Sequence, residues 1–248
     1  MEYSHCCVQE SFVVTGDNNP KPVQKSSSEP QKTDCTLVCY LFELSEQNIN
    51  MEDQKTLIEQ WIRNRKSTFV NGLKEGGDIP DGVISNLLEN AIWAPSHGLV
   101  QAWSFKVFAG MGVNAFFGIQ QKIYKETTPP EKFREEKFEK YLSKSSRVSH
   151  VLAVIMQRDV KKRFPKQEDL VSVACAVQNI YLSMQAYGIA GYLSTGDICY
   201  TQQMREFLRL GEEDECLGFF ILGLPDENVS RPARKRIPAS EKTQWIRE

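Results

Sequence analysis

Long apolar runs are missing from this chain of 248 residues. No stretch reaches the roughly 18 consecutive apolar residues that a membrane-spanning helix needs. Residues 1–10 are polar, and no apolar segment with a cleavage site follows them, so a secretory leader is not expected. A strong excess of one charge is also missing, since the formal net charge is −2. The absence of a basic excess argues against nucleic acid or an anionic membrane surface as partner.

A regular cysteine pattern is the next absence. The seven cysteines are an odd number at irregular spacing, which excludes a simple disulfide framework and favours a reducing, cytoplasmic location. His5, Cys6 and Cys7, together with Cys35 and Cys39, match no known spacing of zinc ligands. We therefore expect no metal site.

The first 50 residues are poor in apolar side chains. Between Asp17 and Asp34 there are three prolines and a serine triplet, and Val23 is the one apolar residue. Such a composition cannot offset the entropy lost on ordering. We predict that residues 1–50 form a disordered or loosely docked extension, and that residues 51–248 form the domain.

What is present from Met51 onward is readable periodicity. Leu57, Ile58, Trp61 and Ile62 mark one face of a helix, and residues 170–184 predict a long, strongly apolar helix that ends at Gly188. The continuous apolar run at 151–156 predicts a strand that is buried on both faces. Further strands are expected at 103–107, 189–193 and 217–222. Helices and strands alternate without regular βαβ repeats, which favours an α+β fold over a doubly wound sheet.

Residues 63–67, at the end of the first helix, combine cations with a hydroxyl. Arg63, Arg65, Lys66 and Ser67 could hold a phosphate through charge-assisted hydrogen bonds. The same cations could equally serve to cap the negative end of a helix. Spacing alone favours the cap.

Two loops carry further polar groups. Residues 94–103 join a helix to a strand and hold His97, one of three histidines, and such a position suits the lining of a pocket. An ordinary surface histidine is the alternative. Residues 187–196 combine glycines with Ser194 and Thr195, which could approach a planar heterocycle closely. This segment is not a GxGxxG fingerprint, so a Rossmann site is excluded, and an ordinary turn between helix and strand is the alternative.

Taken in order, these segments resemble the nitroreductase family, and in particular its compact bacterial NAD(P)H-dependent branch. The resemblance rests on the basic segment before Ser67, on residues 94–103, on the glycine-rich turn, on the strand that ends at Pro225, and on residues 234–238. It runs from about Glu59 to Ile246. It implies an α+β, three-layer sandwich with a central, mostly antiparallel sheet flanked by helices, assembled as an intertwined homodimer with FMN at the subunit interface.

The resemblance also implies roles for particular residues. The ribityl phosphate and the pyrimidine edge of FMN would contact Arg65, Lys66 and Ser67, with Arg234 and Arg236 as further phosphate ligands. Trp93 and His97 of the partner subunit would also contact the flavin.

The remaining positions lie on the turn that follows the long helix. Leu193, Ser194 and Thr195 would lie along the isoalloxazine ring of the flavin. Four positions depart from the family pattern. Phe69 stands where many members have a basic residue, Ala102 replaces a usual proline, and Leu193 and Ser194 stand where close relatives have Trp and Arg.

The activity implied by the resemblance is hydride transfer from NADH or NADPH to FMN, followed by reduction of a small electrophile such as a nitroaromatic or a quinone, in a ping-pong mechanism. No side chain is expected to act as an obligatory acid or base. Two alternatives stay open. One is a different flavin chemistry on the same fold, such as dehalogenation or azoline oxidation, and the other is a flavin-binding protein with little turnover.

Overall fold

The computed structural model describes residues 51–230 and 234–247. The predictions made for residues 1–50, namely the disordered or loosely docked extension and the lack of a zinc site at its cysteines, lie outside the described residues. The helices and strands along the described chain are α2 (Met51–Asn64), α3 (Asp81–Ala91), β1 (Trp103–Ala109), α4 (Met111–Thr127), α5 (Glu135–Ser143), β2 (His150–Met156), α6 (Lys166–Ala186), β3 (Ala190–Ser194), α7 (Gln202–Phe207) and β4 (Glu215–Gly223).

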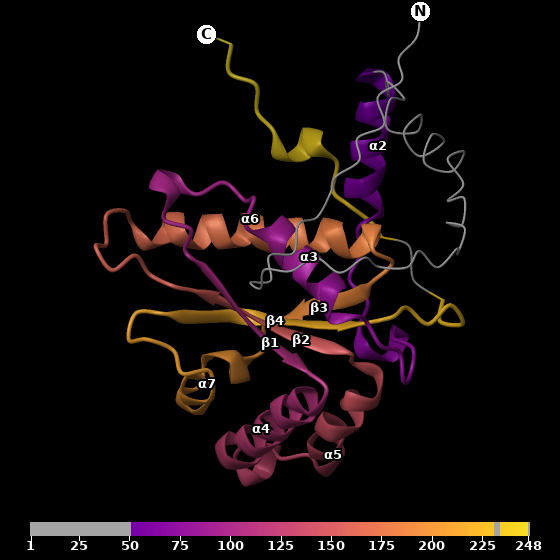
Figure 1. The fold of residues 1–248 in the computed structure, drawn as a ribbon, viewed down its shortest axis with the longest axis vertical. Coiled ribbons are helices and arrows are strands. Elements are labelled where there is room, and N and C mark those ends of the chain that lie inside the picture. Colours follow the sequence, from indigo (N-terminus) through magenta and orange to yellow (C-terminus); the bar gives the residue numbers. More distant parts are fainter. Residues whose placement is uncertain (1–50, 231–233, 248) are drawn as a thin grey trace, which may run out of the picture. The chain divides into compact units, whose positions relative to one another are not determined.

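The strands form one antiparallel sheet in the order β1-β2-β4-β3. All residues of β2 are buried, as the apolar run at 151–156 predicts. Helices lie on both sides of this sheet, with α3 and α6 on one side and α4, α5 and α7 on the other (Figure 1). The α+β class and the antiparallel sheet predicted from the sequence are confirmed.

The alternation of side chains along β2 divides the interior into two cores. Val151, Ala153 and Ile155 point toward the helices α4 and α7, where they join a cluster that includes Phe116 and Met204. The residues between them point the other way, toward α3 and α6, where the cluster contains Leu152, Val154, Met156, Leu87 and Ile180. A slip of one residue in the register of β2 would exchange the two sets.

The end of α6 determines where β3 starts. Gly188 has a φ of +66° directly after the helix, a conformation that favours glycine and ends helices, as the sequence predicts. The chain then returns as β3 against β4. Gly218 in β4 also has a positive φ, of 148°, and a Cβ there would lie 2.8 Å from the carbonyl oxygen of Ser194. Because Gly218 has no side chain, β4 can lie close beside the end of β3, its neighbour in the sheet.

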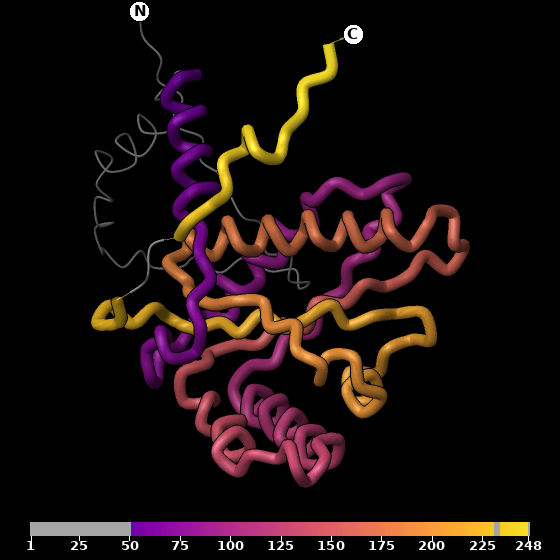
Figure 2. The backbone as a smooth tube through the Cα atoms, turned by 180° about the vertical axis from the view of Figure 1, so that it is seen from behind, coloured from indigo at the N-terminus to yellow at the C-terminus, as the bar shows by residue number. Residues whose placement is uncertain are grey.

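Helix α2 differs from the others because none of its residues is buried. Seen from behind, the described C-terminal segment passes the end of α2 (Figure 2), and the Arg234 guanidinium donates to the carbonyl oxygen of Arg63 at 2.6 Å. None of the described helices is long and apolar enough to cross a membrane.

Candidate functional site

The candidate site is built around the hydroxyl of Tyr181, near the end of α6. The hydroxyl accepts a hydrogen bond from the backbone N–H of Leu193 at 2.8 Å. It also lies 3.4 Å from Oγ of Ser67. The guanidinium of Arg65 lies over the Tyr181 ring, 4.8 Å from its centroid. One side chain thus brings together the basic segment after α2 and the turn that ends β3.

Three guanidiniums gather at the same place. The cost of removing Arg234 from water, with repulsion by Arg65 and Arg236, lowers the pKa of Arg234. None of the three forms an ion pair with a carboxylate of the described residues, whereas their neighbour Arg63 pairs with Glu59 at 2.9 Å. A group of like charges without a carboxylate is the arrangement that a phosphate dianion would stabilise.

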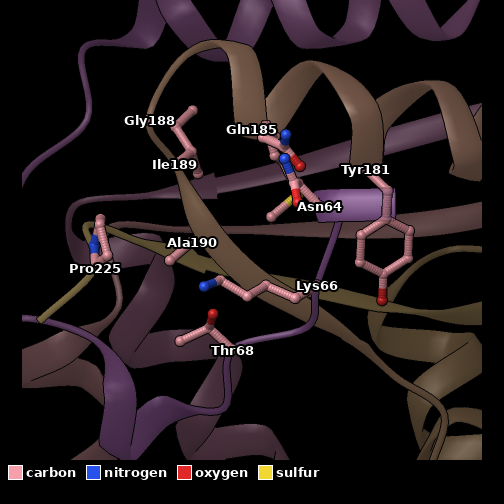
Figure 3. A pocket seen from close by; sticks show the side chains of 10 residues that line it. Asn64, Lys66, Thr68, Tyr181, Gln185, Gly188, Ile189, Ala190 and Pro225 are labelled. Carbon is pink, nitrogen blue, oxygen red and sulfur yellow. The ribbon is translucent and has the colours of Figure 1, made fainter. Parts of the chain in front are cut away.

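Beside this group lies a small cavity of about 270 Å³, lined by residues of the segment after α2, of the end of α6 and of β3. Lys66 and Thr68 lie on the opposite side of it from Gln185 and Gly188 (Figure 3). Oε1 of Gln185 is buried and has no hydrogen-bond partner among the described residues. A buried acceptor without a partner is costly, so its presence beside a cavity indicates a ligand with a donor group.

The turn after β3 leads away from Tyr181. Leu193 and Ser194 are half-buried, and Thr195 is exposed. Phe69, one of the departures from the family pattern, is 68% exposed and packs against the Tyr192 ring at 4.9 Å between centroids.

Cys199, near the turn, does not have the surroundings of a nucleophile. Cys199 and Cys216 are both 3% exposed. A hydrogen bond with Cys216, together with burial, raises the pKa of Cys199. Because only the thiolate is reactive, Cys199 acts as a packing residue. No group of three His, Cys, Asp or Glu side chains that could hold a metal ion occurs among the described residues.

His97 lies at the other end of α6. His97 pairs with Glu168 in the first turn of α6 and stacks on Phe164, at 3.9 Å between ring centroids. Glu168 and Tyr181 are separated by most of the length of α6, about 20 Å at the rise of a helix. Trp93 is 80% exposed. Within one chain, the structure therefore does not bring His97 to the site around Tyr181. Trp93 lies nearer to it, because the carbonyl oxygen of Asn90 accepts both from the backbone N–H of Trp93 at 3.4 Å and from Nδ2 of Asn179 on α6 at 3.2 Å.

The structure corrects one detail of the basic segment. The sequence places residues 63–67 at the end of the first helix, but α2 ends at Asn64. Arg65, Lys66 and Ser67 belong to the segment that follows, where the backbone N–H of Thr68 donates to the carbonyl oxygen of Gly191 at 2.8 Å. This contact between backbones aligns the segment with β3. The backbone N–H of Arg65 still donates to the carbonyl oxygen of Trp61 at 3.2 Å, so the helix-cap alternative stays open for Arg65.

Tyr181 and Gln185 were missed in the sequence, where they appear only as members of an apolar helix. The available signal was their spacing of four residues, which places two polar tips on one face of a helix that is otherwise rich in small and apolar residues. The spacing alone does not show which group the Tyr181 hydroxyl or the Gln185 amide contacts.

Comparison with known proteins gives the family of this chain. The model of the nitroreductase family matches residues 62–224. The chain belongs to the nitroreductase family. The Bacillus subtilis protein named "Putative NAD(P)H nitroreductase YfhC" is 26% identical over 194 residues, which cover 76% of this chain and 94% of that protein.

Solved structures share the fold. The nitroreductase-like family protein from Bacillus cereus has a TM-score of 0.64 at 21% identity, covering 76% of this chain and 95% of that one. The FMN-dependent nitroreductase NfnB from Mycobacterium smegmatis, solved in complex with NADPH, has a TM-score of 0.60 at 18% identity, covering 79% of this chain and 100% of that one. At these identities the likeness is one of fold.

Proposed function

We propose that this protein is an FMN-dependent oxidoreductase that takes a hydride from NADH or NADPH and reduces a small electrophile, such as a nitroaromatic or a quinone, in a ping-pong cycle. The observation that carries the proposal is the gathering of Arg65, Arg234 and Arg236, which have no carboxylate partner within residues 51–230 and 234–247. A phosphate at that point would neutralise their mutual repulsion and form charge-assisted hydrogen bonds.

The residues around the three arginines fit the rest of such a cofactor. Ser67 and Lys66 add a hydroxyl and an ammonium on the same segment, and Gln185 offers a buried acceptor without a partner. A ring with N–H and C=O groups matches these donors and acceptors. Bound FMN would supply the two-electron chemistry, while the protein supplies binding, orientation and electrostatics.

The contributions of the chain's own residues follow from their contacts. Tyr181 fixes the backbone at Leu193, so Ser194 and Thr195 leave β3 in a defined direction. Arg65 is held on the Tyr181 ring and adds positive charge, which would stabilise negative charge that develops on a reduced ring system. No side chain of the site needs to transfer a proton.

We also propose the three-layer, intertwined homodimer of the family, with Trp93 and His97 of one subunit completing the site of the other. The exposure of large apolar side chains supports this assembly, because isolated domains seldom leave so many in water. They lie on α2, in the loop after α3, on α6 and in the C-terminal segment: Leu57 45%, Ile58 54%, Ile62 52%, Trp93 80%, Leu99 80%, Val171 62%, Trp245 78% and Ile246 79%. A cytoplasmic location stays a prediction.

One experiment tests the function. The full chain is purified and examined for the visible absorption of oxidised flavin, and NADPH or NADH is then added without oxygen. We expect bound FMN, and we expect its absorption to bleach and to return on addition of a quinone or a nitroaromatic. FMN that neither nucleotide bleaches would support the flavin-binding protein with little turnover. A protein that takes up no FMN would contradict the proposal.

A further inference from the structure

A second, larger cavity lies on the side of the sheet that carries α4 and α5 (Figure 1). Its volume is about 770 Å³, and it extends from the end of α4 and from α5 to the turn after β3. Four cations line it, namely Lys132, Arg134, Lys137 and Lys144. Asp197 is the one carboxylate among its lining residues, so the cavity is strongly basic.

The cations of this cavity are held in place by aromatic rings. The ammonium of Lys137 lies over the ring of Tyr124 at 4.6 Å, and that of Lys144 lies over the ring of Tyr141 at 4.8 Å. Both tyrosines are buried, at 5% and 7% exposure. The backbone N–H of Arg134 also donates to the Tyr124 hydroxyl at 2.9 Å, which holds the backbone at the cavity, while the rings hold Lys137 and Lys144. Fixed cations lose less entropy on binding an anion than freely rotating ones.

Within the described residues, none of these four cations forms an ion pair. Two acidic side chains of the same helices pair with other lysines: Glu126 with Lys122 at 3.9 Å, and Glu136 with Lys140 at 4.0 Å. Glu135 and Glu139 of α5 are not among the residues that line the cavity. Burial and the nearby Lys137 lower the pKa of Lys144, which means that its positive charge is poorly compensated. An anion in the cavity would relieve this state.

The position of the cavity connects it to the proposed flavin site. Ser194 and Gly196 line it. Ser194 is the residue after Leu193, whose backbone N–H donates to the Tyr181 hydroxyl, and Gly196 lies on the turn that follows. A molecule in this cavity would therefore lie next to the turn proposed to run along the flavin. The reactant of the proposed reaction that carries several negative charges is the nicotinamide dinucleotide, through its pyrophosphate and, in NADPH alone, an additional phosphate.

We propose that this basic cavity binds the phosphate groups of the nicotinamide dinucleotide and selects NADPH over NADH. The inference rests on the proposed function for the identity of the dinucleotide. Lys137 and Lys144 are the residues that determine specificity, because both are fixed on rings, line the same cavity and pair with no carboxylate in the part of the chain that the structure describes.

The first test is a binding titration that does not depend on electron transfer. The full chain, as purified, is titrated by calorimetry with 2′,5′-ADP, with 5′-AMP and with inorganic pyrophosphate. We expect 2′,5′-ADP to bind roughly tenfold more tightly than 5′-AMP, as one additional charge-assisted contact would give. Equal affinity for the two nucleotides would overturn the proposal. Binding of pyrophosphate without 2′,5′-ADP would also overturn it, by assigning the cavity to a small free anion.

The second test uses matched variants. Lys137→Gln and Lys144→Gln should each weaken 2′,5′-ADP binding severalfold and raise the KM for NADPH more than the KM for NADH, with FMN content unchanged. Lys125→Gln, which removes the same charge from α4 outside the cavity, should change neither. If both cavity variants bind 2′,5′-ADP as tightly as the unchanged protein, the site lies elsewhere and the proposal is wrong.

The two tests separate this inference from the proposed function. If the protein contains no FMN but prefers 2′,5′-ADP through Lys137 and Lys144, the result supports the nucleotide site and contradicts the flavin chemistry. A protein whose FMN is bleached equally by NADH and NADPH, with equal KM values and no effect of either variant, would keep the chemistry and reject this site.

Discussion

The Tyr181 hydroxyl and the backbone N–H of Leu193 are joined by a hydrogen bond of 2.8 Å between α6 and β3. The same tyrosine has Arg65 over its ring and Ser67 beside its hydroxyl. Two segments that are far apart in the sequence therefore share one anchor. The position of the turn along which the flavin is proposed to lie depends on that anchor.

Tyr181→Phe should weaken both the fold and the site. The ring stays in place, but the N–H of Leu193 loses its acceptor, and a typical hydrogen bond contributes about 1 kcal/mol to stability. We expect urea unfolding to show a loss of about 1 kcal/mol in the free energy of unfolding, and we expect FMN to dissociate faster. Tyr187→Phe is the matched control, because Tyr187 follows the same helix and is 43% exposed. Equal effects of the two variants would show that the hydroxyl of Tyr181 has no special role.

Arg65→Ala and Arg236→Ala should weaken FMN binding. Each removes a guanidinium that could form a charge-assisted hydrogen bond to phosphate, worth about 1.5–3 kcal/mol, so the Kd should rise by roughly tenfold or more. Fluorescence titration of the apoprotein with FMN measures this. Arg63→Ala removes the same charge from a residue that pairs with Glu59, and it should leave the Kd unchanged. Unchanged affinity in both Arg65 and Arg236 variants would refute the phosphate site.

Periodicity was sufficient to predict the central elements. The continuous apolar run at 151–156 predicts burial on both faces, and β2 is buried throughout because both sides of the sheet carry helices. Residues 170–184 predict α6 for the same reason, since a helix that packs against a sheet needs an apolar face.

Contacts between distant segments could not be predicted in the same way. Tyr181 meets Leu193 only because the chain reverses after Gly188, and periodicity does not show which polar tip then finds which backbone group. The basic cavity is a similar case. Residues 113–146 are charged and aromatic in the sequence, which predicts a helical insertion over a site, and the i,i+4 pair of Glu136 and Lys140 is local to α5. Only tertiary packing decides that Lys137 and Lys144 line the same cavity as Ser194.

Asp169→Asn should be strongly destabilising. Arg158 and Asp169 form an ion pair whose side chains are only 10% and 4% exposed, and the substitution leaves the Arg158 charge buried without its partner. Breaking a buried pair in this way costs about 3–5 kcal/mol. Lys162→Gln breaks an exposed pair with Glu213 and should cost less than about 1 kcal/mol. Urea unfolding of the two variants compares the costs directly, and similar values would show that the buried pair is not special.

Ser149→Ala should lower stability without lowering FMN content. Ser149, His150 and Asp81 resemble a hydrolytic triad. Nδ1 of His150 lies 2.9 Å from the Ser149 hydroxyl, and Nε2 lies 2.9 Å from the Asp81 carboxylate. The Ser149 hydroxyl, however, accepts from the backbone N–H of Ile79 at 2.8 Å and also lies 3.1 Å from the Asp78 carboxylate, to which it donates. It is a structural link. Loss of its acceptor leaves a buried N–H unsatisfied, at about 1–3 kcal/mol. Hydrolysis of simple esters that disappears in the variant would contradict this interpretation.

Lys144→Gln should stabilise the free protein at neutral pH. Burial and Lys137 lower the pKa of Lys144 from its ordinary value of 10.5, so the folded state holds this proton less tightly than the unfolded chain does. Below its folded-state pKa the charged lysine therefore disfavours folding, and this penalty disappears as the pH rises through that pKa toward 10.5. Urea unfolding should show a gain in stability for the variant at pH 7 that shrinks at alkaline pH. Lys125→Gln, the same charge change outside the cavity, should show no such trend. A loss of stability in Lys144→Gln at pH 7 would mean that the contact with the Tyr141 ring outweighs burial, and that the charge needs no anion to compensate it.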